Sequence, residues 1–347
     1  MTIPIPSFLR KRTSLKILHH LLDDRRQKRR FTRGDRSTAS GTILRGKDVE
    51  ASIRYIEQEF RDYLAYGNIS PGELGEKRIL VVGPGDNLGV ALLFLAHGGR
   101  KVVCLDKFEP ERNPEHLAMV YGALRKRLPR PERNRFDEGI SIHYSGRDFS
   151  YNPRMLEYIT GEGLEEGSRR FPPGSFDLIF SRAVLEHLYD PDRAFASMER
   201  LLATGGRMAH KIDLRDHEMF SGGEKHPLTF LTFPGWLWRG MTMHSGKPNR
   251  RLFPYYDRKM RELGYEYTLY ITHIFGKEGD LDPHPPFLRE GVDYDASHLR
   301  LVREIRGRLA REFRSYADEE LLISGIFLSA RKPDGAVPEA TSSNSRS

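Results

Sequence analysis

The chain has 347 residues, 38% of them hydrophobic and 30% charged, a balance typical of globular proteins with a full apolar core. Its single cysteine, Cys104, excludes an intramolecular disulfide framework and a cysteine-rich zinc site. No run of about 18 apolar residues suits a transmembrane helix, and the N-terminus lacks the apolar stretch of a signal peptide, so a cytoplasmic location is expected.

The formal net charge of +8 is concentrated at the N-terminus. Residues 1–34 contain ten basic side chains against only Asp23 and Asp24, which accounts for the whole excess. Leu15, Leu18 and Leu22 share one face of a possible helix. We therefore expect residues 1–47 to form a helical basic segment, which either packs on the body or contacts an anionic membrane or nucleic acid.

Predicted helices and strands alternate along the rest of the chain. The helices are expected at 48–66, 90–99, 114–128, 190–203, 255–265 and 297–314. The strands are expected at 78–82, 101–106, 140–144, 175–181, 205–214, 265–274 and 321–332. In the helix over 190–203, Asp190 is the predicted N-cap and Pro191 the first helical residue. This alternation predicts an α/β protein with a doubly wound, mostly parallel sheet, whose ligand lies at the carboxyl ends of the strands.

A glycine-rich loop, VVGPGDNLG at 81–89, follows the first of these strands. Gly83 and Gly85 match a dinucleotide-binding fingerprint, but Leu88 occupies the place of its third glycine, and Gly89 comes next. Asp106 ends the second strand, where an acidic side chain can accept hydrogen bonds from ribose hydroxyls. These residues suit a nucleoside-containing cofactor, and a nicotinamide dehydrogenase stays open at this point.

The fourth strand and the helix after it separate these possibilities. The stretch contains Ser175-Phe176-Asp177, then Leu185-Glu186-His187, and then a Leu202–Gly206 turn into the fifth strand. It resembles the core of class I S-adenosylmethionine-dependent methyltransferases of the type 11 kind, over about residues 77–275 and the last strand. The resemblance implies a Rossmann-like sheet of seven strands with the last one antiparallel, and S-adenosylmethionine as cofactor. The domain would span 48–332, with a cap after strand five at 215–253, a second insertion at 276–320 and a disordered tail at 333–347.

The same resemblance implies which residues hold the methyl donor. Val81 stands where the family often carries an acid, so Asp86 or a backbone contact is expected to substitute. Asp148, after the expected third strand, is a candidate for the adenine amino group. The complete set of cofactor candidates is Gly83, Pro84, Gly85, Asp86, Gly89, Asp106, Lys107, Asp148, Ser181 and Arg182.

Candidates for the chemistry follow strands four and five. Methyl transfer to oxygen requires in-line approach and a base for the acceptor proton. We favour His217 as that base, oriented by Asp213 or Asp216, while His187 either takes part or orders its loop. His210 and Asp213 lie on opposite faces of a regular strand and cannot both converge on one point. Two aspartates and a histidine also suit a divalent ion, but no ligand-spacing motif is matched and no metal is expected.

An aromatic segment over 226–253 comes next. It can form a small cap core, the wall of an acceptor pocket, or both, because aromatic faces suit sugar rings and arginine suits carboxylate or phosphate. The substrate-binding candidates are His210, Trp236, Trp238 and Arg250. The order DLRDH, aromatic segment, PNRR resembles methyltransferases associated with bacterial surface-polysaccharide gene clusters.

The expected function is methyl transfer to a hydroxyl of a small molecule or glycan. An RNA-directed methyltransferase that uses the basic segment is the main alternative. However, Ser181-Arg182-Ala183 stands where amino-methylating nucleic-acid enzymes carry Asn/Asp-Pro-Pro-aromatic, and residues 35–347 are formally neutral. A methyltransferase-like binding module without activity is the third possibility.

Overall fold

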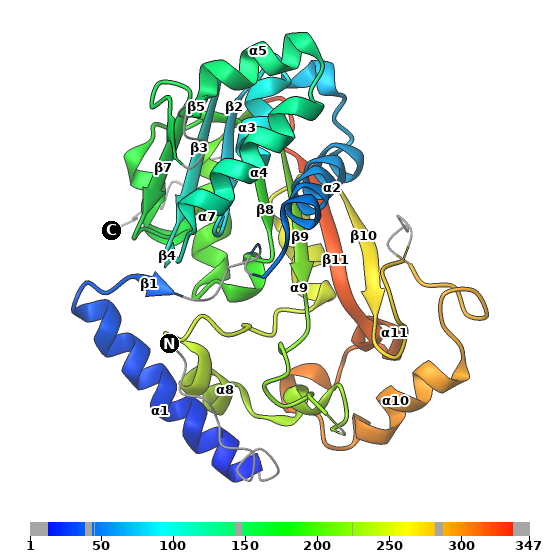
Figure 1. The fold of residues 1–347 in the computed structure, drawn as a ribbon. Helices are drawn as coiled ribbons and strands as arrows, with labels where there is room; N and C mark the ends of the chain where they lie inside the picture. Colours follow the sequence, from blue (N-terminus) through cyan, green and yellow to red (C-terminus); the bar gives the residue numbers. More distant parts are fainter. Residues whose placement is uncertain are drawn as a thin grey trace, which may run out of the picture.

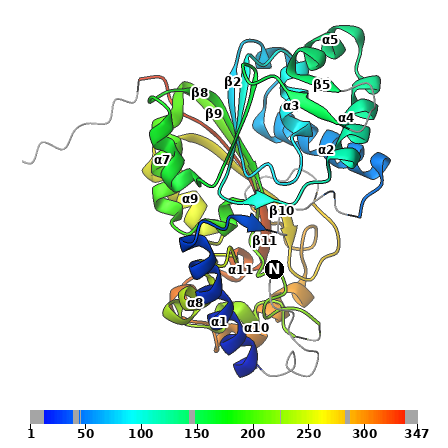
Figure 2. The same cartoon turned by 60° about the vertical axis from the view of Figure 1, so that its left-hand side comes forward.

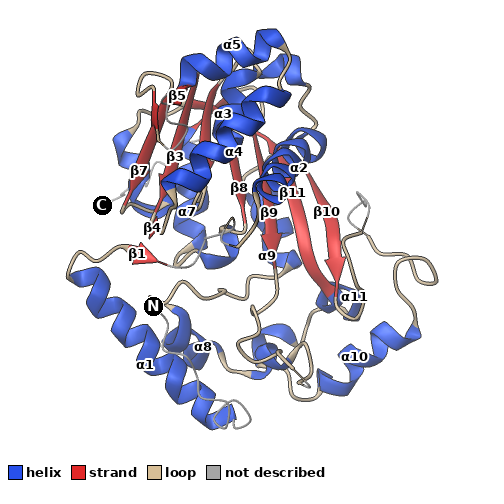
Figure 3. Cartoon of the chain, viewed as in Figure 1, coloured by secondary structure: helices blue, strands red, loops and turns tan. Residues whose placement is uncertain are grey.

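The computed structural model describes residues 13–38, 44, 46–142, 148–223, 225–281 and 287–335. A seven-stranded sheet lies at its centre, with strand order β10-β11-β9-β8-β2-β3-β7. Its strands are β2 (Arg78–Val82), β3 (Lys101–Asp106), β7 (Leu156–Thr160), β8 (Phe176–Arg182), β9 (Leu202–Asp213), β10 (Glu266–Ile274) and β11 (Ile323–Arg331). β11 pairs antiparallel with both β9 and β10, and the other pairings in the sheet are parallel. The predicted fold class is confirmed (Figures 1 and 3).

One predicted strand is wrong. The segment Ile140–Ile142 forms β5, which pairs antiparallel with β6 (Phe149–Tyr151) in a separate two-stranded sheet. The third strand of the main sheet is β7, paired in parallel with β3 so that Thr160 lies beside Asp106. β7 lies at the edge of the sheet, and its partly exposed middle residues hide it from a search for continuous apolar runs.

Helices cover both faces of the sheet. The helices of the domain are α2 (Val49–Gly67), α3 (Gly89–Ala96), α4 (Pro114–Arg127), α5 (Arg130–Gly139), α6 (Leu164–Gly167), α7 (Pro191–Leu201) and α9 (Phe253–Glu262). Figure 2 shows α2 to α5 on one side of the sheet and α7 with α9 on the other. The N-terminus of α7 agrees with its prediction, because the Asp190 side chain accepts a hydrogen bond from the Arg193 N–H and Pro191 opens the helix.

Successive side chains of the central strands belong alternately to two hydrophobic cores, one on each face of the sheet. Ile79 and Val81 of β2 join the cluster beneath α2, α3 and α4, whereas Leu80 and Val82 join the cluster beneath α7 and α9. This alternation is what a strand buried on both faces requires. Val81, which stands where an acid was considered, is therefore a core residue.

A cap closes the end of the molecule toward which β9 points (Figure 1). It contains α1 (Thr13–Thr32), α8 (Gly235–Thr242), α10 (Ala296–Arg306), α11 (Asp318–Leu322) and the 3-10 helix η5 (Thr229–Thr232). Its aromatic residues Phe220, Phe230 and Trp238 are buried and continue the core beneath α7 and α9. After α1 the chain forms β1 (Ser37–Thr38), which pairs with β4 (Glu109–Pro110) just beyond β3. The N-terminal segment thus reaches the carboxyl edge of the sheet.

Candidate active site

The glycine loop turns sharply at the carboxyl end of β2. Gly83 and Gly85 have φ of +63° and +71°, a left-handed conformation that glycine adopts without strain. A Cβ on Gly83 would lie 2.4 Å from Cγ2 of Val184, which follows β8. Ala183 is also left-handed, with φ of +53°. Two neighbouring strands therefore end in turns that touch, and Gly83 leaves no room there for a larger residue.

The third glycine of the loop serves packing. A Cβ on Gly89 would lie 2.5 Å from Cδ1 of Ile56, so α3 begins in direct contact with α2. Asp86 is buried, and its carboxylate accepts a hydrogen bond of 2.9 Å from the Leu44 N–H. A cavity of about 400 Å³ opens beside the loop. Its lining comprises Leu44, Gly46, Lys47, Asp86, Glu111, Arg112, Asn113, His116 and Leu117.

Asp106 is an acid at the carboxyl edge that forms no ion pair within the described part of the chain, although the charge of Arg112 acts on it. Burial raises its pKa to about 6, although the backbone N–H groups of Phe108 and Gly85 donate to it. Such a carboxyl can accept hydrogen bonds from neutral hydroxyl groups at neutral pH. The neighbouring Lys107 lies 4.2 Å from the Tyr189 ring centroid and 3.5 Å from Glu166, so the adjacent cation is held by other partners.

The corrected third strand changes which acid flanks Asp106. Asp148 begins the small β5–β6 hairpin, is exposed, and accepts a hydrogen bond from its neighbour Phe149. This is not the end of a strand in the main sheet, so the expected contact with adenine loses its basis. Glu162 follows β7 instead and binds Arg170 through two hydrogen bonds of 2.7 Å. The signal for it was the Gly-Glu-Gly stretch that follows LEYIT in the sequence.

The candidates at the end of β8 are engaged in protein contacts. Ser181 and His210 are fully buried and hydrogen-bonded to each other at 2.7 Å. Burial also lowers the pKa of His210 to about 3. These positions leave neither side chain free to touch a substrate. Arg182 binds Asp62 on α2 at 2.7 Å, so it anchors that helix.

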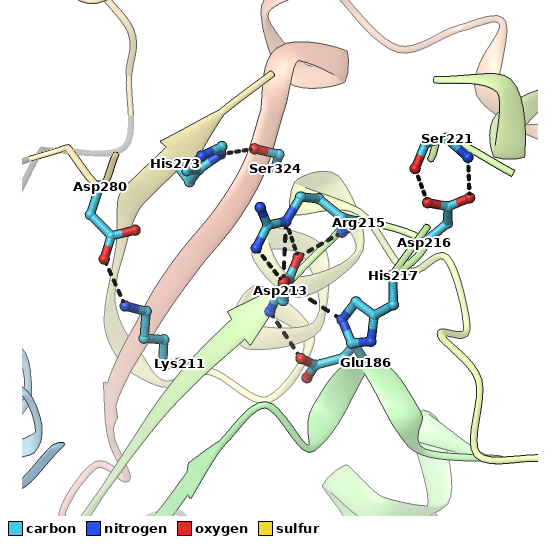
Figure 4. A network of polar contacts seen from close by, with 10 residues as sticks. All are labelled: Glu186, Lys211, Asp213, Arg215, Asp216, His217, Ser221, His273, Asp280 and Ser324. Carbon is cyan, nitrogen blue, oxygen red and sulfur yellow. Dashed lines mark hydrogen bonds and ion pairs between the residues drawn. The ribbon is translucent and has the colours of Figure 1, made fainter. Parts of the chain in front are cut away.

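His217 and Asp213 come together just beyond β9 (Figure 4). His217 Nε2 lies 3.6 Å from Asp213 Oδ2, and the backbone of His217 is left-handed with φ of +49°. Arg215 also binds Asp213, at 2.7 Å. Burial opposes ionisation of Asp213, but hydrogen bonds from His217 and Arg215 outweigh it and hold its pKa well below the usual range. A carboxylate that is ionised at neutral pH therefore faces a half-exposed imidazole.

Glu186 and His187 place buried polar atoms close to the Asp213–His217 pair. Glu186 accepts from the Asp213 N–H through Oε1, whereas its Oε2 and Nδ1 of His187 lack partners among the described residues. Burial raises the pKa of Glu186 to about 8 and lowers that of His187 to about 3. The ligand atoms of Glu186, His187 and His217 lie within 4.8 Å of one another, so these three could hold a metal ion.

Other sequence candidates lie away from this point. Asp216 is fully buried and accepts from the N–H groups of Phe220 and Ser221, which closes a turn pointing away from His217 (Figure 4). It does not orient that imidazole. Of the two expected orienting residues, the structure brings only Asp213 to His217.

The cap residues expected to bind substrate also have structural roles. Trp238 is buried, and its indole donates to the Pro248 carbonyl at 2.8 Å. Arg250 is buried and donates to the carbonyls of Phe230 and Phe233. Both contacts support the cap-core interpretation of this segment and contradict a pocket wall at these two residues. Trp236 is 76% exposed and packs in no core.

The sequence did not predict a polar group that extends the site across β9, β10 and β11 (Figure 4). Lys211 of β9 binds Asp280 at 3.1 Å, and His273 of β10 hydrogen-bonds Ser324 of β11. The pairing of β10 with β11 shifts register at His273. Such a shift re-aims a side chain at a sheet rim. Together with Asp213 and Arg215, these residues form a group of polar side chains at the edge of the sheet, which we call the rim network.

Comparison with known proteins gives a match inside this domain. The methyltransferase-domain family matches residues 145–210, which include β7, β8, α7 and most of β9. No curated protein matches the chain. Phosphoethanolamine N-methyltransferase 2 of Haemonchus contortus, solved with S-adenosyl-L-methionine, is 15% identical with a TM-score of 0.41. The alignment covers 80% of this chain but only 53% of the nematode protein.

A second solved structure is an S-adenosylmethionine-dependent methyltransferase from Mesorhizobium loti. It is 16% identical, with a TM-score of 0.40 over 80% of this chain and 99% of that one. The strand order with its antiparallel β11 gives the sheet a Rossmann-like form. Within it, residues 145–210 match a methyltransferase domain.

Proposed function

We propose that the chain methylates a hydroxyl group of a small-molecule or glycan acceptor, with His217 as general base and Asp213 as the residue that orients it. The observation that carries this proposal is the pairing of a half-exposed imidazole with an ionised carboxylate beyond β9. Val184 joins this site to the glycine loop, because it packs against Gly83 and directly precedes Leu185-Glu186-His187.

The cofactor site fits a methyl donor that has a ribose and no phosphate. The loop backbone is open to close approach at Gly83 and Gly85, and Asp106 offers a carboxylate that no described residue ion-pairs, so it can accept from a diol. When bound, S-adenosylmethionine supplies an electrophilic methyl group. We assign Gly83, Pro84, Gly85 and Asp106 to its binding, and we add Glu162 as the first acidic residue after β7.

The protein's own groups move the proton. The imidazole of His217 accepts the proton of the acceptor hydroxyl as the oxygen approaches the methyl group. Asp213 stabilises the imidazolium that forms, and Arg215 keeps Asp213 ionised throughout. Glu186 is protonated at neutral pH, so it can donate a hydrogen bond to the acceptor. Its unpartnered Oε2 and the unpartnered Nδ1 of His187 would be satisfied by a polar acceptor.

The rim network favours a glycan among the possible acceptors. A sugar presents many hydroxyl groups, and Lys211, His273, Asp280 and Ser324 offer both donors and acceptors within one surface. The resemblance of DLRDH and PNRR to polysaccharide-associated enzymes supports the same choice. A cytoplasmic role in polysaccharide biosynthesis follows as part of the proposal.

One observation supports RNA methylation, and it concerns the basic segment. Five cations of α1 and the turn after it are exposed, and they could contact phosphates. Beyond β8 and β9 the described cations Arg182, Arg215 and Lys211 are each paired with an acid. A binding module without activity would need neither the Asp213–His217 pair nor an ionised Asp213.

Calorimetric titration with S-adenosylhomocysteine tests the cofactor site, with NADH as comparator. We expect binding of S-adenosylhomocysteine that is lost in Asp106→Ala, and no binding of NADH. The base is tested with an acceptor found by screening nucleotide sugars and glycans. His217→Gln should lower kcat about 10²- to 10⁴-fold while the affinity for S-adenosylhomocysteine stays unchanged. Unchanged kcat in that variant would refute the assigned base, and NADH binding alone would refute the methyl donor.

A chelator control distinguishes His217 as a general base from His217 as a metal ligand. Glu186, His187 and His217 have the spacing of a possible metal site, so activity should be measured after dialysis against EDTA. The general-base mechanism predicts unchanged kcat. A loss that added Mn²⁺ or Zn²⁺ restores would show that His217 acts as a ligand, and the base would then have to be sought elsewhere.

A further inference from the structure

The outer helix α1 packs Ile17 and Leu21 partly buried against the core, but it also buries polar residues and leaves two leucines exposed. Its buried residues are Lys16, His20, Asp23 and Asp24. Leu18 and Leu22, in contrast, are 53% and 51% exposed. A surface helix ordinarily turns its leucines to the core and its charges to water. The outward face of α1 is therefore the unusual one, and it needs an explanation.

The orientation of α1 is held by specific contacts on its inward side. Asp24 accepts hydrogen bonds from the N–H groups of His244 and Ser245, at 2.6 and 3.0 Å. Lys16 donates to the carbonyl of Met219 at 3.2 Å. A rotation that buried Leu18 and Leu22 would break these bonds and leave buried groups of the cap unpaired. The leucines thus face outward because the helix is fixed that way.

The exposed apolar surface continues onto α8. Gly240 of α8 lies against Leu21 of α1, and a Cβ there would be 3.1 Å from its Cδ2. Trp236 lies one turn before Gly240, and Met243, the C-cap of α8, lies three residues after it, so both flank the contact with α1 while staying exposed. Among the described residues, seven large hydrophobic side chains are exposed, and four of them are Leu18, Leu22, Trp236 and Met243. Figures 1 and 2 both show α1 along the outside of α8.

Exposed cations flank these apolar residues. They are Arg25, Arg26, Lys28, Arg29 and Arg33 of α1 and its following turn, and Arg239 of α8. None of the six forms an ion pair with another residue in the described part of the chain. The sequence adds Arg10, Lys11 and Arg12 directly before α1. One surface therefore combines leucines, a tryptophan, a methionine and unpaired positive charge.

We propose that this surface, formed by α1 and α8, binds the face of an anionic lipid bilayer. Leucine, tryptophan and methionine side chains enter the headgroup and acyl boundary, while arginine and lysine bind lipid phosphates. Nucleic acid would use the cations but would leave the two leucines without a role. Among the described helices, none is both long and apolar enough to cross a membrane. The attachment is therefore peripheral, and it brings the cap and the active site next to the bilayer.

Vesicle flotation of the full chain tests this surface, with phosphatidylcholine vesicles that contain or lack phosphatidylglycerol. The protein should float only with the anionic vesicles. Arg25→Gln combined with Arg29→Gln should weaken partitioning about thirtyfold, because each surface cation contributes about 1 kcal/mol. Leu18→Gln combined with Leu22→Gln should weaken it as well. Met119→Gln is the matched control, since Met119 is 51% exposed on α4, outside this surface.

Tryptophan fluorescence reports the contact directly. Trp236 is 76% exposed and Trp238 is 2% exposed, so a blue shift on vesicle addition comes from Trp236. We expect that shift with anionic vesicles and its quenching by brominated lipids. Equal partitioning of the wild type and the arginine variant, or binding of a single-stranded RNA without any vesicle binding, would overturn the proposal. S-adenosylhomocysteine titration of each variant confirms the fold and keeps this result separate from the proposed reaction.

Discussion

The contact between the glycine loop and the turn after β8 can be tested by adding one methyl group. Gly83→Ala must hold an alanine at φ of +63°, and its Cβ must meet Cγ2 of Val184 at 2.4 Å. The left-handed backbone costs about 1–2 kcal/mol and overpacking a further 1–3 kcal/mol. Valine cannot swing away easily, because its branched Cβ restricts χ1. We expect the free energy of unfolding to fall by about 2–5 kcal/mol.

Gly264→Ala is the matched control for this substitution. Gly264 has φ of +65°, and a Cβ there meets nothing within 4 Å. Its variant should therefore lose only the backbone term, about 1–2 kcal/mol. Urea unfolding of both variants gives the steric term by difference. Val184→Ala, measured alone and together with Gly83→Ala, completes a double-mutant cycle. Removing the two methyl groups of Val184 should recover most of the steric cost of Gly83→Ala.

The result that would refute this reasoning is a Gly83→Ala variant no less stable than Gly264→Ala. A cycle in which Val184→Ala fails to rescue Gly83→Ala would likewise show that the two turns do not compete for space. S-adenosylhomocysteine affinity should fall in Gly83→Ala and stay unchanged in Gly264→Ala, because only the first substitution displaces the proposed cofactor loop.

Three further predictions concern burial and pH. Asp106 has a pKa of about 6, so calorimetric affinity for S-adenosylhomocysteine should fall about tenfold per pH unit below 6. Because its folded pKa exceeds the value of about 4 for a free aspartate, its contribution to the stability of the ligand-free protein is lost as pH rises through 6. Glu186 has a pKa of about 8, so wild-type stability in urea should decline toward pH 8 more steeply than that of Glu186→Gln, and equal slopes would contradict this burial. Trp238→Ala should cost about 3–5 kcal/mol of unfolding free energy and Trp236→Ala less than about 0.5, and similar losses would contradict the cap core.

The sequence predicted the parts of the fold that rest on local signals. RILVV and KVVCLD are unbroken apolar runs between turn residues, and both are central strands. β7 was not predicted, because only Leu156 and Ile159 of its five residues are buried and the sequence lacks a continuous apolar run there. α5 was missed for a related reason, because only Phe136 and Gly139 of its ten residues are buried. Elements at the edge of the molecule carry weak periodicity, since only a narrow side of each meets the core.

The candidate site was predictable only where its residues are close in sequence. Asp213 and His217 are four residues apart and meet in space. Lys211 and Asp280, or His273 and Ser324, meet only because β10 and β11 end at the same edge of the sheet as β9. Asp216 illustrates the opposite error, because it is adjacent to His217 in sequence yet turns inward to cap Phe220 and Ser221. One residue of separation in a tight turn is enough to send two side chains in different directions.

The strand order also sets when the site can be completed during synthesis. β10 is bonded only to β11 within the sheet, and β11, the last strand to be made, lies between β9 and β10. A nascent chain that ends before Ile323 can build the glycine loop, Asp106 and the turn after β8, but β10 then has no neighbour to join. The cofactor half can thus exist on the ribosome before the rim network does. The proposed methyl-donor site can therefore form first, and the proposed acceptor side is complete only once β11 has been made.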